Sequence, residues 1–292
     1  MSTVGELSSS LHARVAEAEA TLSDGALGVS VYDYLSGFRF NYDASRWFHA
    51  ASTIKVAILA AVFDAIGAGR FTLEHRVHVR NRFLSAIDGG PFRVQPSRDA
   101  DGGVHAAIGH TMRIGDLARH MIVASSNLAT NLLLDAVGLD EARATLERRR
   151  IAGVDLRRGV EDDRAFDAGC NNRITAAGAV HLLQAIRDGG GFPPGASEAM
   201  LDILCDQQFE GGIGPGLPEA VRAVARVAHK TGDISSASHD IGLVYLPGRP
   251  PYVVAVLTES GGDAATRTVT VGAVSRAVFD AVAAAGETRS WR

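Results

Sequence analysis

Three short polar motifs interrupt apolar segments of this chain, and each carries a side chain that can take part in acyl transfer. Ser52 and Lys55 lie in the run FHAASTIKVAILAAVF, Ser125 and Asn127 lie between two helical patterns, and Lys230–Gly232 ends a strand-like run. Positions three apart in a helix share a face, so Ser52 and Lys55 would point into the same volume. A serine hydroxyl is a good nucleophile only when a neighbouring base removes its proton. The spacing therefore favours a nucleophile with a base beside it.

Each motif also has a purely structural interpretation. Ser52 or Ser125 can cap a helix, Asn127 can cap the helix that follows it, and Lys-Thr-Gly can form the turn at the end of a strand. A single Ser-x-x-Lys tetrapeptide occurs by chance in many proteins. The order of the three motifs favours chemistry, because Ser-x-Asn follows Ser-x-x-Lys by about seventy residues and Lys-Thr-Gly comes near the C-terminal end.

The composition is typical of a folded protein with a large core, since 46% of the 292 residues are hydrophobic and 21% are charged. The net charge of −4 comes from 29 basic and 33 acidic residues spread along the chain, which offers no basic patch for nucleic acid or an anionic membrane. No apolar run reaches the ~18 residues of a membrane span, and no export signal is visible. We expect a monomer that acts on a small molecule in the cytoplasm, or outside the cell or in the periplasm if the first residues replace a removed signal peptide.

The pattern of elements places strands on both sides of a helical middle. Two strand-like stretches, 26–34 and 38–43, are joined by the turn Leu-Ser-Gly. Helical patterns follow at 52–66, 114–124, 127–137, 140–149, 175–187 and 196–207. Strand-like runs return at 223–231, 241–247 and 252–259, before a last helix at about 265–285. Short turns between sequential strands favour antiparallel pairing, so the sequence predicts an α+β fold with terminal helices covering the sheet.

The three motifs in this order resemble those of the penicillin-recognising serine hydrolases. FHAASTIKVAILAAVF and SSNLATNLLLDAVG are similar in particular to class A β-lactamases, and the resemblance covers roughly residues 25–285. It implies a five-stranded antiparallel sheet flanked by helices plus an all-helical lobe. In a single domain, the α/β lobe would span about 1–50 and 224–292 and the helical lobe about 51–223. It also implies hydrolysis of β-lactams through an acyl-enzyme, with no cofactor and no metal.

By similarity, three of these residues carry out the transfer of the acyl group. Ser52 is the nucleophile, Lys55 is its general base or proton relay, and Ser125 passes a proton to the leaving nitrogen. A lysine can act as a base near neutral pH only where burial or a second cation lowers its pKa. Lys230 is the candidate for that second cation.

The remaining candidates bind the substrate. By similarity, Asn127 contacts the substrate amide, and Lys230 with Thr231 binds a carboxylate on a strand that continues through Gly232. The backbone N–H groups of Ser52 and Asp233 would form the oxyanion hole. An exposed strand edge at 230–234 can also pair with a substrate amide, as an added strand would.

The chain departs from the class A pattern at its middle motif and in its deacylation loop. Ser126 stands at the centre of the usual Ser-Asp-Asn motif, so a carboxylate that often pins the loop is missing. Class A enzymes also carry Glu-x-x-x-Asn soon after an arginine. Here Glu161 is the only glutamate of the loop, and Ala165 stands where the asparagine is expected. Glu161 is the candidate to hold the deacylating water, and Asp163 is the weaker alternative.

Two interpretations of this acidic loop stay open, since a run of charged residues is commonly just a solvated surface. Without the asparagine partner, the sequence predicts slow release of the acyl group. His239 and Asp240 also stand near the end of the Lys-Thr-Gly strand, where class A enzymes often place a carboxylate-binding arginine. Two alternatives to a β-lactamase remain: an esterase, amidase or D-amino-acid peptidase with the same residues, or a sensor that is acylated once.

Overall fold

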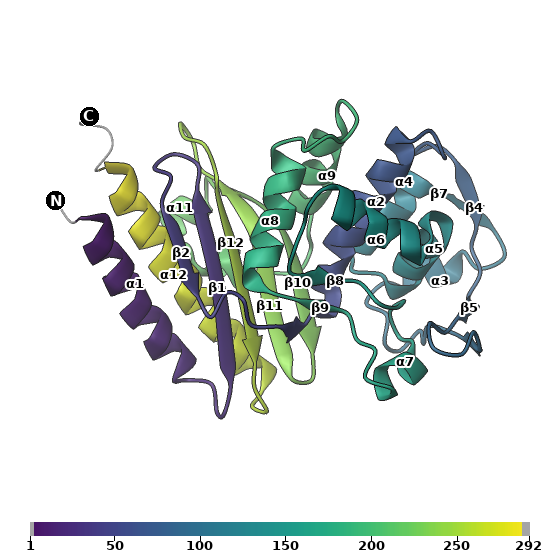
Figure 1. Ribbon diagram of the computed structural model, residues 1–292, viewed down its shortest axis with the longest axis horizontal. Coiled ribbons are helices and arrows are strands. Elements are labelled where there is room, and N and C mark those ends of the chain that lie inside the picture. The colour runs from purple at the N-terminus through teal and green to yellow at the C-terminus, as the bar shows by residue number, and fades with distance from the viewer. Residues whose placement is uncertain (1–2, 288–292) are drawn as a thin grey trace. The chain divides into compact units, whose positions relative to one another are not determined.

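The structure is a computed structural model that describes residues 3–287 and folds as two compact units (Figure 1). We call them the sheet unit and the helical unit. The sheet unit comprises residues 3–53, 174–184 and 210–287. The helical unit comprises residues 54–173 and 185–209. The elements β9 (Arg173–Ile174) and α8 (Ala176–Arg187) have residues in both.

The sheet unit contains a five-stranded antiparallel sheet with the strand order β10-β11-β12-β1-β2. Its strands are β1 (Ala26–Asp33), β2 (Arg39–Tyr42), β10 (Arg226–Ile234), β11 (Ala237–Tyr245) and β12 (Tyr252–Glu259), and the short β3 is Phe48–His49. Its helical segments are α1 (Val4–Glu19), the 3-10 turn η1 (Ala51–Thr53), α10 (Ile213–Gly216), α11 (Glu219–Arg222) and α12 (Ala264–Glu287). β10, which carries Lys-Thr-Gly, is an edge strand of this sheet.

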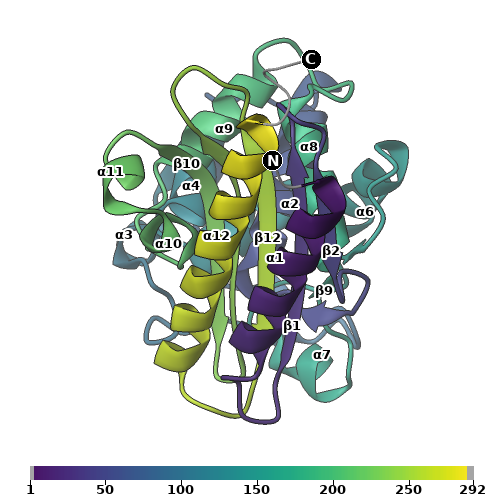
Figure 2. The ribbon, with the colours of Figure 1, turned by 90° about the vertical axis from the view of Figure 1, so that its left-hand side faces the viewer.

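The core of the sheet unit lies between the sheet and two helices. β1, β11 and β12 are buried along almost their whole length, as expected of strands that are covered on both faces. Figure 2 shows α1 and α12 side by side across one of these faces. The apolar side chains of both layers form one buried cluster, whose members include Leu11, Val15, Val29, Val254, Val274 and Val278. The terminal helices therefore cover the sheet as the sequence predicted.

α12 is also long and apolar enough to cross a membrane, judged by length and composition alone. Half of its apolar stretch, Ala264–Gly286, is buried inside the protein. Val271, Val274 and Val278 belong to the core beneath the sheet. A core helix of a folded protein passes the same test as a membrane span, and the packing of α12 accounts for its apolar face.

The helical unit consists mainly of helices, with two short antiparallel strand pairs. Its helices are α2 (Ile54–Gly67), α3 (Gly102–Ala106), α4 (Ile114–Ile122), α5 (Asn127–Val137), α6 (Leu139–Arg148), α7 (Asp163–Asp167) and α9 (Ala196–Cys205). The strand pairs are β4 (Arg76–His78) with β7 (Thr111–Arg113) and β5 (Phe83–Leu84) with β6 (Pro91–Phe92), and β8 is Val154–Asp155. The sequence pattern had not indicated these strand pairs, which are too short to show a periodicity.

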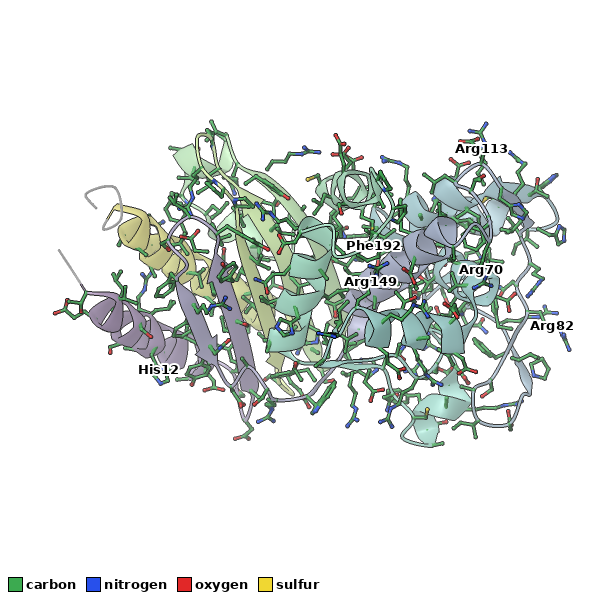
Figure 3. All side chains as sticks on the ribbon, turned by 45° about the horizontal axis from the view of Figure 1, so that its top comes forward. His12, Arg70, Arg82, Arg113, Arg149 and Phe192 are labelled. Carbon is green, nitrogen blue, oxygen red and sulfur yellow. The ribbon has the colours of Figure 1, made fainter. Side chains whose placement is uncertain are left out.

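α2 carries Lys55 and has apolar residues on all sides, so it is a core helix: 11 of its 14 residues are buried. Near its C-terminal end, Asp64 binds Arg148 and Arg149 and accepts a 3.0 Å hydrogen bond from Thr145. The Arg149 guanidinium also lies over the ring of Phe192, 3.7 Å from its centroid (Figure 3). These contacts fix α2 within the helical unit, and with it the backbone of Lys55.

The predicted α+β fold, with its five-stranded antiparallel sheet and its separate group of helices, is confirmed. Two long elements match their predicted ranges: α5 is Asn127–Val137 and β12 is Tyr252–Glu259. Both carry strong patterns, helical in the first case and a continuous β-prone run in the second.

Candidate active site

Ser52 lies in the 3-10 turn η1, which ends at Thr53 immediately before α2 begins at Ile54. The sequence had predicted an α-helix from residue 52, and this boundary was wrong by two residues. The cause is local, because Ala51 has a φ of +46° and residues 51–53 form a 3-10 turn, in which the backbone bond reaches three residues back rather than four. The N–H and the hydroxyl of Thr53 both bind the Ala50 carbonyl oxygen, at 3.1 and 2.5 Å. The candidate nucleophile is therefore presented on a tight, strained turn.

The strand β10 packs against η1 at Gly232. A Cβ atom on Gly232 would lie 3.0 Å from Thr53 Cγ2 and 3.1 Å from the Thr53 nitrogen, closer than most side chains approach. Glycine therefore allows the strand and the turn to approach this closely. Ser52 and Asp233, whose N–H groups are the expected oxyanion donors, belong to these two contacting segments. The role of Gly232 is thus to permit the contact.

Lys230 and Thr231 are buried in β10, opposite Ile241 and Asp240 of β11. The Lys230 ammonium donates a 3.0 Å hydrogen bond to the Thr231 carbonyl oxygen. Burial lowers the pKa of Lys230 to about 7, although the nearby Asp240 and Asp233 favour its charged form. A substrate carboxylate at this strand would also favour the charged form of Lys230. The fraction of Lys230 that carries a positive charge therefore depends on pH.

His239 does not replace the arginine that the sequence lacks. Its Nε2 donates to the His49 carbonyl oxygen at 2.8 Å, and its Nδ1 accepts from the Thr258 N–H at 3.2 Å. Burial lowers the pKa of His239 to about 4, so the ring is neutral at pH 7. Asp240 accepts hydrogen bonds from His229 Nδ1 at 2.8 Å and from the Ile213 N–H at 3.0 Å. Neither residue supplies a cation for a substrate.

Arg267 of α12, which the sequence analysis did not single out, is buried beside the same strands. Its guanidinium donates to the carbonyl oxygens of Ser235, Ser260 and Ile234 at 3.0, 3.1 and 3.3 Å. It therefore fixes the β10–β11 turn and the end of β12 rather than offering a charge to a ligand. An arginine within an apolar helical pattern is the only signal of this role in the sequence.

In the helical unit, the structure brings Lys55, Ser125 and Asn127 together. The Lys55 ammonium is fully buried and donates to the Ser125 carbonyl oxygen at 2.7 Å, to Ser125 Oγ at 3.2 Å and to Asn127 Oδ1 at 2.8 Å. All three acceptors are uncharged oxygens. The lysine is thus held within hydrogen-bond distance of the Ser125 hydroxyl, as proton transfer to that hydroxyl requires.

Glu161 is joined to the same cluster through Asn127. Its Oε1 accepts from Asn127 Nδ2 at 2.8 Å and its Oε2 from the Gln95 N–H at 2.9 Å, and only 5% of the side chain is exposed. The loop before it is clamped by Asn131, which exchanges two 2.9 Å hydrogen bonds with the backbone of Val160. Glu161 therefore has an asparagine partner, although this asparagine is not the one that the class A spacing would provide.

Asp163, the weaker candidate, lies at the edge of this cluster, because the Arg98 guanidinium that binds it also lies 3.7 Å from Glu161 Oε2. The Asp163 carboxylate pairs with the guanidinium of Arg98 at 2.8 Å, and 63% of its side chain is exposed. This is the solvated acidic position that a charged run commonly indicates. The structure thus separates the two acidic candidates, burying Glu161 and leaving Asp163 at the surface.

Backbone strain is found at two candidate residues and beside a third. Among residues 3–287, six residues other than glycine have a positive φ, and three of them are Ala51, Ser125 and Glu161, with φ of +46°, +56° and +60°. Such conformations cost of order 1–3 kcal/mol each and persist only where the surrounding contacts hold them. Their concentration at or beside Ser52, Ser125 and Glu161 supports a functional interpretation of all three.

This strain allows the hydroxyl of Ser125 to be tested separately from its backbone. We expect Ser125→Gly and Ser125→Ala to slow acylation equally, since both remove the hydroxyl. Only glycine accepts a φ of +56° without strain, so Ser125→Gly should be more stable than Ser125→Ala by about 1 kcal/mol, or about 2 °C in Tm. Thermal unfolding and acylation rates of the two variants check this. Equal Tm values would show that the strain is absent in solution.

Asp99 also belongs to this cluster, and sequence reasoning missed it. Its buried carboxylate accepts from the backbone N–H groups of Asn127 and Leu128, at 2.9 Å each. The stretch 81–110 was recognised only as polar, rich in glycine and long enough to be functional. No motif spacing connects residue 99 to residue 127, so only the fold reveals the contact.

Comparisons with known proteins agree with this geometry. A sequence model of the β-lactamase enzyme family matches residues 10–282. β-Lactamase L2 of Stenotrophomonas maltophilia is 26% identical over 246 residues, which are 81% of this chain and 74% of the relative. The crystal structure of a β-lactamase from Sphaerobacter thermophilus is 29% identical, with a TM-score of 0.77 over 94% of this chain and 98% of that one. An ancestral class A β-lactamase is 27% identical, with a TM-score of 0.78 over 93% and 99% of the two chains. Together with the cluster around Lys55, these matches show that the chain belongs to the β-lactamase enzyme family.

Proposed function

We propose that this protein is a serine β-lactamase, which opens the β-lactam amide bond through an acyl-enzyme on Ser52. The observation that carries the proposal is the hydrogen-bonded series in which Lys55 binds Ser125 and Asn127, and Asn127 binds Glu161. In this series Lys55 is the first base, the Ser125 hydroxyl relays protons, and Glu161 is the second base. The relatives of this protein that are named β-lactamases support the same substrate class. All proposed residues come from one chain, so the reaction needs no second subunit. We therefore propose that the protein acts as a monomer on a small molecule.

Acylation uses the first part of this series. Lys55 in its neutral form takes the proton of Ser52, and the Ser52 oxygen attacks the lactam carbonyl carbon. The N–H groups of Ser52 and Asp233 donate to the oxygen that becomes negative. The carbon–nitrogen bond then breaks, the Ser125 hydroxyl gives its proton to the ring nitrogen, and Lys55 returns a proton to Ser125.

Deacylation uses Glu161. Its carboxylate takes a proton from a water molecule that attacks the ester carbonyl, and the bond to Ser52 breaks as that proton is returned to the serine oxygen, which leaves Glu161 ionised again. Asn127 holds one carboxylate oxygen at 2.8 Å, while the other is bound by the Gln95 N–H. The carboxylate is therefore oriented, which is what a base acting on one particular water molecule needs.

Nitrocefin hydrolysis by the purified protein tests this function. Colour development over many equivalents per protein molecule supports a β-lactamase. One stoichiometric burst supports a sensor that is acylated once. No reaction with nitrocefin, together with cleavage of an activated ester or of a D-amino-acid peptide, supports the other hydrolase activities. A Ser52→Ala sample measured in parallel shows whether any activity depends on the proposed nucleophile.

The burial of Lys230 predicts a pH-dependent affinity for substrates that carry a carboxylate. Below its pKa of about 7 the ammonium is charged and attracts the carboxylate, and above it the charge is lost as the pH rises. We expect KM for a penicillin to rise with pH above about 7, by up to ~10-fold per unit. The methyl ester of the same penicillin lacks the carboxylate but leaves all other ionisable groups of the protein and substrate unchanged. Its KM should therefore not show this rise. Equal pH profiles for the acid and its ester would contradict the role of Lys230.

A further inference from the structure

Asp99 is a fully buried carboxylate that belongs to neither the Ser-Ser-Asn motif nor the acidic loop. Besides the N–H groups of Asn127 and Leu128, it lies 3.3 Å from the hydroxyl of Ser126 and 3.1 Å from His105 Nε2. The Asp101 N–H also donates to Asp99 at 3.2 Å, so five donors from residues 101–105 and 126–128 converge on one side chain. They include two N–H groups at the start of α5, where a negative charge is also stabilised by the helix dipole.

The carboxylate of Asp99 is separated from the reacting groups by one residue, Asn127. Asp99 binds the backbone of Asn127, while the side chain of Asn127 binds Lys55 Nζ and Glu161 Oε1, both at 2.8 Å. A shift of the Asn127 backbone would therefore alter its contacts with both proposed bases at once. Small displacements of a base such as Lys55 or Glu161 have large effects on the reaction rate, because proton transfer needs the two groups to be at hydrogen-bond distance.

We propose that Asp99 is the positioning residue of the Ser-Ser-Asn motif: it supplies from residue 99 the carboxylate that class A enzymes carry at the position of Ser126. The proposal rests on the proposed function for its kinetic consequences, while its structural content stands on the contacts alone. Ser126 caps α5 by accepting the Ala129 N–H at 3.2 Å, so an aspartate at position 126 would lie against the same helix start. One carboxylate is needed there, and two would repel each other.

His105 completes the cluster from α3. Its Nε2 donates to Asp99, while its buried Nδ1 has no hydrogen-bond partner among the described residues. This ring is therefore held by Asp99 and by packing, and in return it orients the carboxylate towards α5. The side chain of the neighbouring Asp101 makes different contacts, since it caps α3 through the Gly103 N–H at 2.8 Å and binds His120 at 2.5 Å, while only the backbone N–H of Asp101 donates to Asp99. Asp101 thus provides a matched control.

The test is a double-mutant cycle with Asp99→Ala, Ser126→Asp and the double variant, and with Asp101→Asn as the control. Acylation and deacylation rates with a β-lactam are measured well below the Tm of each variant. We expect Asp99→Ala to slow both steps by about 10-fold or more, as for directly coupled groups. Ser126→Asp alone should also be slower, because it places a second carboxylate beside Asp99. The double variant should be faster than either single variant, and Asp101→Asn should match the wild type.

A residue that only stabilised the fold would lower Tm without slowing the reaction of the folded protein. Additive effects in the cycle, or an unchanged rate in folded Asp99→Ala, would overturn the proposal. Amide hydrogen exchange at residues 126–129 supplies a readout that needs no reaction. It should be faster in Asp99→Ala, restored in the double variant and unchanged in Asp101→Asn. If the wild type does not react with β-lactams while this exchange pattern is found, the proposed function fails and the positioning role stands. An unchanged exchange pattern in Asp99→Ala overturns the positioning role whatever the activity.

Discussion

Replacement of Ser52 by alanine is expected to abolish covalent labelling of the protein by β-lactams and by fluorophosphonates. The reason is chemical, because the acyl group is carried by the Ser52 oxygen and no other group in the proposed scheme can form that bond. The fold should survive, since the change removes one half-buried hydroxyl and surface or half-buried changes of this kind cost about 1 kcal/mol or less. Intact mass after incubation with excess reagent, together with thermal unfolding, measures both effects.

Ser45→Ala is the matched control, because Ser45 is an exposed serine of the same unit. It should be labelled as fast as the wild type. Labelling that persists in folded Ser52→Ala would mean that the nucleophile is another residue, and peptide mapping would identify it. Loss of labelling in both variants would point to a general defect of the preparation rather than to chemistry at Ser52.

The elements that carry the fold were predictable because their patterns are long. The helix Asn127–Val137 and the strand Tyr252–Glu259 each bury a long run of mainly apolar side chains, and their bounds follow from the sequence. The turn at Ser52 was not predictable, since nothing in its sequence announces a φ of +46° at Ala51. Apolar periodicity reports which face is buried and does not report the backbone conformation at the first residue of an element.

The motif residues were predictable as a group, and the contacts that complete the cluster were not. Ser52, Lys55 and Ser125 are identified by spacing within short segments of the chain. By contrast, the contact between Glu161 and Asn127 joins residues 34 positions apart, and the contact of Asp99 with Asn127 spans 28 positions. A sequence motif records only spacing along the chain, so a partner supplied by another segment escapes it. This is why both departures from the class A pattern look like losses in the sequence, whereas the structure brings the Asp99 carboxylate to Ser126 and the Asn127 amide to Glu161.

The second large effect is expected for Glu161→Gln, which should trap the acyl-enzyme. The sequence alone predicted an adduct that persists in the wild type, because no asparagine follows Glu161 at the class A spacing. Asn127 supplies that partner at 2.8 Å, so we now expect the wild type to consume benzylpenicillin without accumulating an adduct. Glutamine has nearly the same shape but cannot accept the proton of water. Deacylation should then slow by ~10²–10⁴-fold, while acylation through Lys55 continues.

Intact mass after mixing with excess benzylpenicillin measures this directly, since Glu161→Gln should gain one drug-sized increment that lasts for minutes or longer. Asp163→Asn is the matched control, because it removes the same charge from the same loop at a position that is 63% exposed. It should turn over as the wild type does. A double variant with Ser52→Ala should gain no mass, which places the increment on Ser52. If Glu161→Gln keeps full turnover, the base is another group. If the wild type itself holds the adduct for minutes, the contact with Asn127 orients Glu161 without making it a competent base, and the slow release predicted from the sequence is the correct description.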